Sequence, residues 1–95
     1  MLSDSEYKKG AQLFKALSHP IRLLIVNNLL KEERCVNDIQ DLVTVSQPNI
    51  SSHLNILRYS GIVDFRQEGN LRCYYLREPQ KIKELLEVLQ SILNT

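Results

Sequence analysis

Residues 46–61 read SQPNISSHLNILRYSG, and the spacing of their apolar side chains decides how this segment folds. Ile50, Leu54 and Leu57 fall at positions i, i+4 and i+7, so an α-helix would place them on one face and bury them together. The other positions carry amides, hydroxyls, a histidine and an arginine, which the same helix would turn outward. The pattern predicts a helix with one buried stripe and one long polar face.

This polar face contains no acidic residue. The chain has 11 Asp and Glu residues, yet none lies between Leu42 and Val63. Negative charge is therefore excluded locally and is not scarce overall. Because the backbone of DNA is a dense array of negative phosphates, such an exclusion favours a DNA-binding surface. The net charge of +1 is small, so the local distribution of charge carries more weight than the total.

The length of 95 residues fits a single domain, 1–95, and leaves little room for a second core. A chain of this size buries only about 60 to 65% of its unfolded surface. Association with a second copy would cover more apolar surface. We therefore expect one domain that forms a dimer.

The cysteines and the apolar runs indicate where the protein works. Cys35 and Cys73 are far apart and do not form the dense framework of a small secreted protein. No signal-peptide core is present at the N-terminus, and no apolar run approaches the ~20 residues needed to cross a bilayer. We expect a soluble cytoplasmic protein in a reducing compartment, with no membrane contact.

Several helices are predicted from the same kind of spacing. Ser3 followed by Glu6 forms a capping box for the first helix, and Ser18 can cap the second, with Pro20 in its first turn. Only Thr44 and Val45 separate the third helix from Ser46, which is the spacing of a helix-turn-helix. The helices are expected over residues 4–17, 18–29, 36–43 and 46–61.

Beyond Gly61 the pattern changes from helical spacing to strand alternation. Residues 62–67 and 71–77 alternate, and Glu68, Gly69 and Asn70 lie between them, which predicts a β-hairpin whose tip could act as a wing. Pro79 begins a last helix with an apolar stripe that ends at Leu93. The predicted fold is therefore mainly α with one β-hairpin, in the order α-α-α-α-β-β-α.

This order of elements, together with three stretches of sequence, resembles the ArsR/SmtB family of bacterial winged helix-turn-helix transcriptional repressors. The stretches are ALSHPIRLLIVNNL, SQPNISSHLNILRYSGIV and GNLRCYYL. The resemblance covers nearly the whole chain. Its most specific residues are Ser46, Gln47, Ser51, His53, Leu54, Leu57, Gly61, Ile62 and Val63. It implies a homodimer that packs through its first and last helices, occupies an operator without effector, and leaves it when a metal or another inducer binds.

A two-fold dimer would present two recognition helices to successive major grooves, roughly 34 to 36 Å apart on one face of double-stranded DNA. A palindromic operator follows. Amides near the start of the helix can pair with adenine, and hydroxyls and imidazole reach bases or phosphates. Cations on the hairpin would grip phosphates or enter the minor groove. The candidate DNA-binding residues are Gln47, Asn49, Ser51, Ser52, His53, Arg58, Arg66, Asn70 and Arg72.

Some of these residues also have structural interpretations. His53 could make a hydrogen bond inside the helix-turn-helix instead of contacting DNA. Arg66 and Arg72 could pair across the hairpin with Asp64 or Glu68. His19 precedes Pro20 at a helix start, where a capping or packing role is favoured over a ligand role.

The sequence does not identify the effector that would release the protein from its operator. Members of the resembled family with an arsenic or cadmium site carry Cys-Val-Cys where this chain has Cys35, Val36 and Asn37, and one cysteine does not supply the thiolates that soft metals need. Residues 81–95 contain no His or Cys for the zinc-type site of the last helix. The common family metal sites are therefore incomplete, and a metal or metalloid effector has no assigned residues.

A thiol-reactive inducer is the remaining hypothesis. Cys35 at a helix N-terminus would have a lowered pKa and raised reactivity. Cys73 falls on a strand near Arg66 and is the weaker candidate. Both cysteines could instead be small apolar fillers of the core.

Two other functional classes fit the sequence less well than a DNA-binding regulator does. A winged-helix protein-interaction module would use the same fold without direct operator binding, but the acid-free polar face argues against it. An enzyme is not expected, because the chain shows no nucleophile elbow, no phosphate-binding Gly loop and no metal-ligand cluster.

Overall fold

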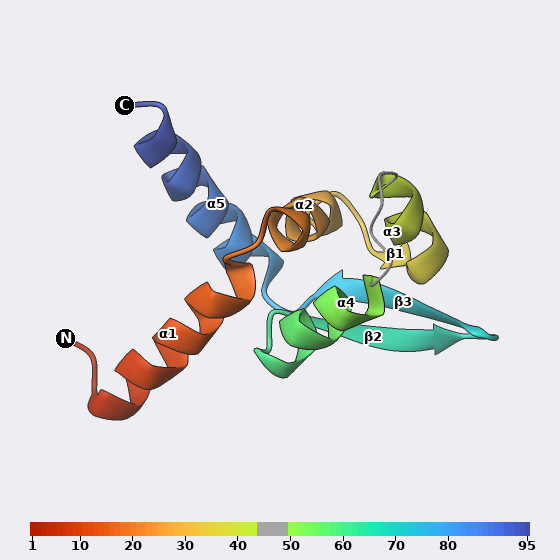
Figure 1. The fold of residues 1–95 in the computed structure, drawn as a ribbon, viewed down its shortest axis with the longest axis horizontal. Coiled ribbons are helices and arrows are strands. Elements are labelled where there is room, and N and C mark those ends of the chain that lie inside the picture. The colour runs from red at the N-terminus through yellow and green to blue at the C-terminus, as the bar shows by residue number, and fades with distance from the viewer. Residues whose placement is uncertain (44–49) are drawn as a thin grey trace.

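The computed structural model describes residues 1–43 and 50–95, and within these ranges it contains five helices and three strands (Figure 1). The elements in chain order are α1 (Asp4–Leu17), α2 (Pro20–Leu29), β1 (Arg34–Cys35), α3 (Val36–Leu42), α4 (Ile50–Tyr59), β2 (Val63–Glu68), β3 (Leu71–Leu76) and α5 (Pro79–Leu93). The predicted class, mainly α with a β-hairpin, is confirmed. None of the described helices is long and apolar enough to span a lipid bilayer.

The first helix begins at the predicted capping box. The Ser3 hydroxyl accepts a hydrogen bond from the backbone N–H of Glu6 at 3.1 Å, and the Glu6 carboxylate accepts one from the N–H of Ser3 at 2.9 Å. These two bonds satisfy N–H groups that have no partner inside the helix. They also lower the pKa of Glu6, because they stabilise its charged form.

The start of α2 differs from the expectation. His19, not Ser18, is the N-cap residue, and its Nδ1 accepts a hydrogen bond from the N–H of Ile21 at 3.0 Å. Ser18 instead closes α1, donating its hydroxyl hydrogen bond to the carbonyl of Lys15 at 2.7 Å. Pro20 occupies the first helical turn as expected, where a missing N–H costs nothing. The predicted capping role of His19 is confirmed.

The wing is a hairpin of β2 and β3 within a three-stranded antiparallel sheet of order β1-β3-β2. Glu68 lies opposite Leu71, so Gly69 and Asn70 alone make the turn. Gly69 has φ of 60°, a left-handed conformation that side chains disfavour and glycine adopts freely. The edge strand β1 was not predicted, because two residues are too few to show alternation.

Helix α4 buries the stripe that its sequence predicted. Ile50, Leu54 and Leu57 are buried in the core. The helix stops before Gly61, whose φ of 82° turns the chain, and the N–H of Ile62 then bonds the carbonyl of Leu57 at 3.0 Å. The expected start of this helix at Ser46 lies outside the described residues.

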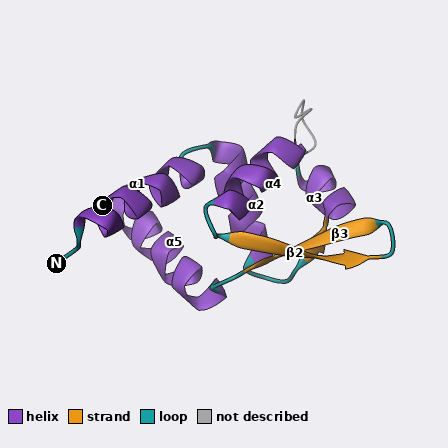
Figure 2. Ribbon diagram, turned by 90° about the horizontal axis from the view of Figure 1, so that it is seen from below, coloured by secondary structure: helices purple, strands orange, loops and turns teal. Residues whose placement is uncertain are grey.

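Different elements form the two ends of the molecule. Helices α1 and α5 form one end, where both termini lie, and the hairpin extends at the other (Figures 1 and 2). Helix α4 packs between them, against α1, α2 and β2. The core therefore holds α4 in place and leaves its polar face next to the wing.

Candidate nucleic-acid interface

The polar side of α4 and the hairpin together border a hollow on the surface. Figure 2 shows α4 running beside the β2–β3 hairpin. The hollow is lined by Val36, Ser51, Asn55, Gln67, Asn70, Arg72 and Tyr74. Its polar side chains offer hydroxyl, amide and guanidinium groups, which can donate to bases and phosphates, and none of the described residues that line it carries a carboxylate.

Three of the predicted DNA-binding residues meet at this hollow. Ser51 comes from α4, Asn70 from the hairpin turn and Arg72 from β3. Ser52 is exposed on α4 next to Ser51. Gln47 and Asn49, the predicted adenine-reading residues, lie outside the described residues.

Two lining residues with amide side chains were absent from the sequence-based set. Asn55 follows Ser51 by one helical turn and was identifiable as an outward position of α4. Gln67 lies opposite Arg72 in the hairpin register. Its position depends on the length of the turn, which is fixed only when the strand pairing is known.

His53 corrects one expectation, because it does not face outward. The residue is only 9% exposed, and its Nδ1 lies 3.1 Å from Nη1 of Arg22. The ring of His19 packs against it with ring centroids 4.5 Å apart. The alternative of a hydrogen bond inside the helix-turn-helix therefore describes His53 better than a DNA contact.

Arg58 is held at the C-terminal end of α4 by the first residues of the wing. Its Nε donates to Asp64 at 3.1 Å, and its guanidinium lies 4.5 Å from the centre of the Phe65 ring. Hydrogen bonds from the Phe65 N–H and from Arg58 lower the pKa of Asp64. Because Asp64 already neutralises this cation, Arg58 is a weaker phosphate ligand than an unpaired arginine.

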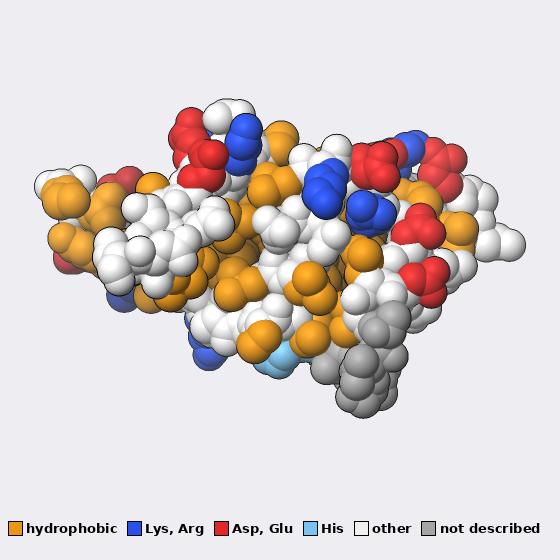
Figure 3. Space-filling view, turned by 90° about the horizontal axis from the view of Figure 1, so that it is seen from above, with side chains coloured by type: hydrophobic (Ala, Val, Ile, Leu, Met, Phe, Trp, Pro, Cys, Tyr) orange, Lys and Arg blue, Asp and Glu red, His pale blue; other side chains and the backbone are white. Residues whose placement is uncertain are grey.

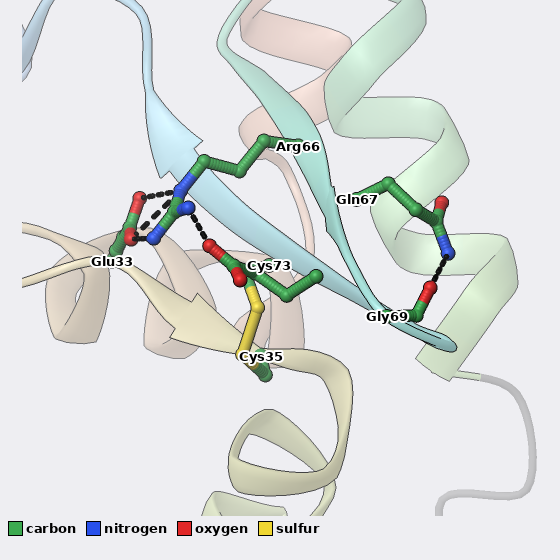
Figure 4. Close-up of a disulfide and its surroundings, with 7 residues drawn as sticks. Glu33, Cys35, Arg66, Gln67, Gly69 and Cys73 are labelled. Atoms are coloured by element: carbon green, nitrogen blue, oxygen red, sulfur yellow. Dashed lines mark hydrogen bonds and ion pairs between the residues drawn. A yellow bond between two sulfur atoms is a disulfide. The ribbon is translucent and has the colours of Figure 1, made fainter.

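Arg66 is more fully paired, and by a residue that the sequence did not suggest. Its Nε donates to both carboxylate oxygens of Glu33, at 2.9 and 3.0 Å, and its Nη1 pairs with Glu68 (Figure 4). Hydrogen bonding from Arg66 lowers the pKa of Glu33. Glu68 was an expected partner of Arg66, but both residues lie on β2, so this pair runs along the strand and not across the hairpin. Glu33, which follows α2, is the second partner.

Arg72 differs from Arg66 in its surroundings. Its guanidinium lies 4.4 Å from the centre of the Phe65 ring, which is a cation–π contact. Among residues 1–43 and 50–95, no ion pair involves Arg72. It therefore keeps its charge available beside the polar hollow.

The two cysteines form a disulfide, which contradicts the expectation of free thiols. Cys35 on β1 lies opposite Cys73 on β3, and the bond closes across a sequence separation of 38 residues (Figure 4). Cys35 is also the N-cap residue of α3, the position on which the hypothesis of a reactive thiol was based. The sequence separated the two residues, and only the pairing of β1 with β3 brings them together.

The part of the chain that the structure describes offers no ready metal site. No three His, Cys, Asp or Glu side chains gather there in an arrangement that could hold an ion. The metal effector suggested by resemblance therefore has no described ligand set.

At the opposite end, an apolar surface lies on α1 and α5. Phe14, Val88 and Ile92 are 63%, 58% and 62% exposed. Figure 3 shows hydrophobic side chains gathered along the part of the surface that these helices form. A groove follows them, lined by Phe14, Leu17, Ser18, Leu23, Leu85, Leu86, Val88, Leu89 and Ile92. Contiguous apolar surface of this kind marks an interaction site.

Comparison with known proteins shows which family the chain belongs to. Residues 19–64 match the model of the bacterial regulatory protein arsR family. An uncharacterized HTH-type transcriptional regulator of Methanocaldococcus jannaschii is 39% identical over 88 residues, which is 92% of this chain and 98% of the relative.

Solved structures agree with this relationship. The transcriptional repressor BigR from Xylella fastidiosa has a TM-score of 0.76 at 35% identity, covering 97% of this chain and 96% of that one. A homodimeric winged helix-turn-helix DNA-binding domain from Mycobacterium bovis has a TM-score of 0.82 at 26% identity, covering 98% and 88%. The chain belongs to the arsR family of bacterial regulatory proteins and is a winged helix-turn-helix transcriptional regulator, not an enzyme.

Proposed function

We propose that the protein is a homodimeric cytoplasmic repressor that binds a palindromic operator through α4 and the wing. The observation that carries this proposal is the acid-free polar hollow between α4 and the hairpin. The names of the relatives support it, since BigR is described as a repressor and the M. bovis domain as homodimeric and DNA-binding.

The proposed dimer pairs α1 and α5 of one copy with those of the other. The exposed Phe14, Val88 and Ile92 would become buried in that contact. Because both helices lie at the end away from the hairpin, the wings would remain free for DNA. The two-fold axis would then set the half-site spacing at about one helical turn.

The proposed contacts divide by chemistry. Ser51, Ser52 and Asn55 would reach base edges or nearby phosphates from α4, and Asn70 and Arg72 would hold the backbone from the wing. Gln47 and Asn49 remain proposed adenine contacts. His53, which is buried, is removed from the set of direct contacts.

The test is selection of bound duplexes from a random pool, followed by binding measurements at increasing salt. We expect an inverted repeat and an affinity that falls steeply with salt, because phosphate contacts release counterions. Failure to enrich any duplex, with a folded dimer in hand, would favour the protein-interaction module instead.

Arg72 and Arg66 provide a matched pair of variants on the wing. Arg72→Gln should weaken operator binding and lower the slope of log affinity against log salt by about one, as expected for one lost phosphate contact. Arg66→Gln should change that slope much less, because Glu33 and Glu68 already neutralise Arg66. Fluorescence anisotropy at several salt concentrations measures both. Equal slopes for the two variants would contradict the assignment.

We further propose that the Cys35–Cys73 pair is the effector site and that oxidation is the inducing signal. The protein would bind DNA in the cytoplasm, where thiols are kept reduced and a disulfide is usually transient and regulatory. The first thiolate would attack the O–O bond of a peroxide and become a sulfenic acid, with release of water. The second thiol would condense with it and release a second water. Since Cys35 is the N-cap of α3, this bond acts directly on the first helix of the helix-turn-helix.

Oxidation of the reduced protein with peroxide should lower its operator affinity about tenfold, within the usual range of coupling between two sites. Cys35→Ser and Cys73→Ala should each bind the operator equally well before and after peroxide treatment. Anisotropy titrations with the redox state confirmed by mass spectrometry measure this. Release of DNA from either variant on oxidation would exclude the pair as the sensor.

A further inference from the structure

His53 is the buried polar residue that the proposed DNA contacts do not use. Among the described residues it is the sole polar or charged side chain in the buried class, and it lies on the recognition helix itself. Burying an imidazole is costly unless it is hydrogen-bonded, so its partner is informative. That partner is Arg22 of α2.

Arg22 connects three helices through one planar group. Its Nη1 contacts Nδ1 of His53 on α4 at 3.1 Å, and its Nε donates to the carbonyl of Ala16, in the last turn of α1, at 2.5 Å. A guanidinium has only donors, so Nδ1 of His53 must be the acceptor and the neutral ring carries its proton on Nε2. The contact therefore exists only while His53 is uncharged.

We propose that Arg22 and His53 are a positioning pair that fixes the recognition helix against α1 and α2, and that protonation of His53 releases it and weakens operator binding. Neither residue touches DNA in this scheme, which rests on the proposed operator binding through α4. Because α1 carries part of the proposed dimer surface, the same pair links that surface to the DNA-binding helix.

The surroundings of His53 make its neutral form the stable one near neutral pH. Burial lowers the pKa of His53, and the neighbouring His19 and Arg22 lower it further. His19 lies at the start of α2 with its ring against that of His53, and Arg22 follows in the first turn. From α1, Lys15 lines the same surface cleft as Arg22. None of these three neighbours carries a carboxylate that could stabilise a protonated His53 ring.

The sign of the effect follows from this lowered pKa. The unfolded chain takes up a proton on His53 near its ordinary pKa of 6.5, whereas the native protein resists protonation until lower pH. The unfolded state therefore binds more protons below about 6.5, and both native stability and the Arg22 contact are lost as the pH falls.

Operator affinity measured between pH 7.5 and 5.5 should fall about tenfold in the wild type, the size expected for loss of one hydrogen bond to a charged group. His53→Asn should remove this dependence, because its amide oxygen can accept near the Nδ1 position and does not titrate. His53→Gln, whose amide lies farther out, should bind about tenfold more weakly even at pH 7.5. Circular dichroism at each pH keeps unfolding separate from loss of binding.

Two further variants act as controls. His19→Asn retains an N-cap side chain for α2, so operator binding should still fall on acidification, but at a higher pH because His19 no longer lowers the pKa of His53. Arg22→Lys keeps the charge but not the fork that bonds Ala16 and His53 together, so it should bind weakly. Wild-type and His53→Asn profiles that fall in parallel would overturn the proposal, as would a flat profile in His19→Asn alone.

Nitrogen NMR of the imidazole of His53 in the wild-type protein tests the Arg22–His53 contact without DNA, because it shows which ring nitrogen carries the proton. We expect the Nε2–H form of His53 at pH 7.5 and its loss on acidification. A proton on Nδ1 at pH 7.5 would overturn the pair even if every variant failed to fold. Since this measurement needs no operator, failure of DNA binding and failure of the Arg22–His53 contact give different results.

Discussion

Reduction of the Cys35–Cys73 disulfide is expected to lower the free energy of unfolding by about 4 kcal/mol. The bond closes a loop of 38 residues, so its loss gives the unfolded chain many more conformations. The folded state changes less, because β1 and β3 remain neighbours in the sheet through their own pairing. For a domain of this size such a loss is a large part of the total stability. Urea denaturation with and without a dithiol reductant measures it.

A double variant, Cys35→Ser with Cys73→Ala, is the control for this prediction. It should unfold at the same urea concentration with and without reductant, and near the midpoint of the reduced wild type. Coincident unfolding curves for oxidised and reduced wild type would contradict a cross-link that stabilises the native fold. A shift in the double variant on adding reductant would mean that the reductant acts elsewhere.

Val88→Glu is expected to convert the proposed dimer to a monomer and to lower operator affinity more than 100-fold. Val88 is 58% exposed on the apolar face of α5, so a glutamate costs little in the isolated chain. In the dimer its carboxylate would be buried without a partner, at a cost of roughly several kcal/mol. Because a monomer reaches one half-site only, DNA binding would lose the benefit of two linked contacts. Sedimentation and anisotropy measure the two effects.

Ser91→Glu is the matched control, since it adds the same charge to the same helix. Ser91 is exposed and does not line the apolar groove of α1 and α5. This variant should remain dimeric and bind the operator nearly as well as the wild type. A dimeric Val88→Glu protein with normal affinity would show that α5 does not form the contact between copies.

The local elements were predictable because short-range rules decide them. The capping box at Ser3, the apolar spacing of Ile50, Leu54 and Leu57, and the Gly69 turn each involve residues only a few positions apart. The predictions were wrong or incomplete where two neighbouring residues could both act as the helix cap, or where a strand was too short to show alternation. Ser18 and His19 could both cap α2, and β1 was too short to show a period.

The proposed DNA-binding surface was predictable in outline for the same reason. An acid-free helix face and a hairpin with arginines can be read along the chain, and Ser51, Asn70 and Arg72 do border one hollow. The local sequence could not show whether each arginine is free to bind a phosphate or is already paired with a carboxylate. Arg66 is neutralised by Glu33, which lies 33 positions away and was not considered as its partner.

The sequence by itself determined the helices and the wing, because periodicity, capping and turn chemistry act over a few residues. The arsR-family identity came from the resemblance of its motifs, which can also be read along the chain. Tertiary structure alone decided that Cys35 and Cys73 are joined, that Arg66 is paired, and that His53 is buried against Arg22. These contacts bridge 38, 33 and 31 positions of the chain. Such pairs are set by how helices and strands pack around a shared core, and no local pattern records that packing.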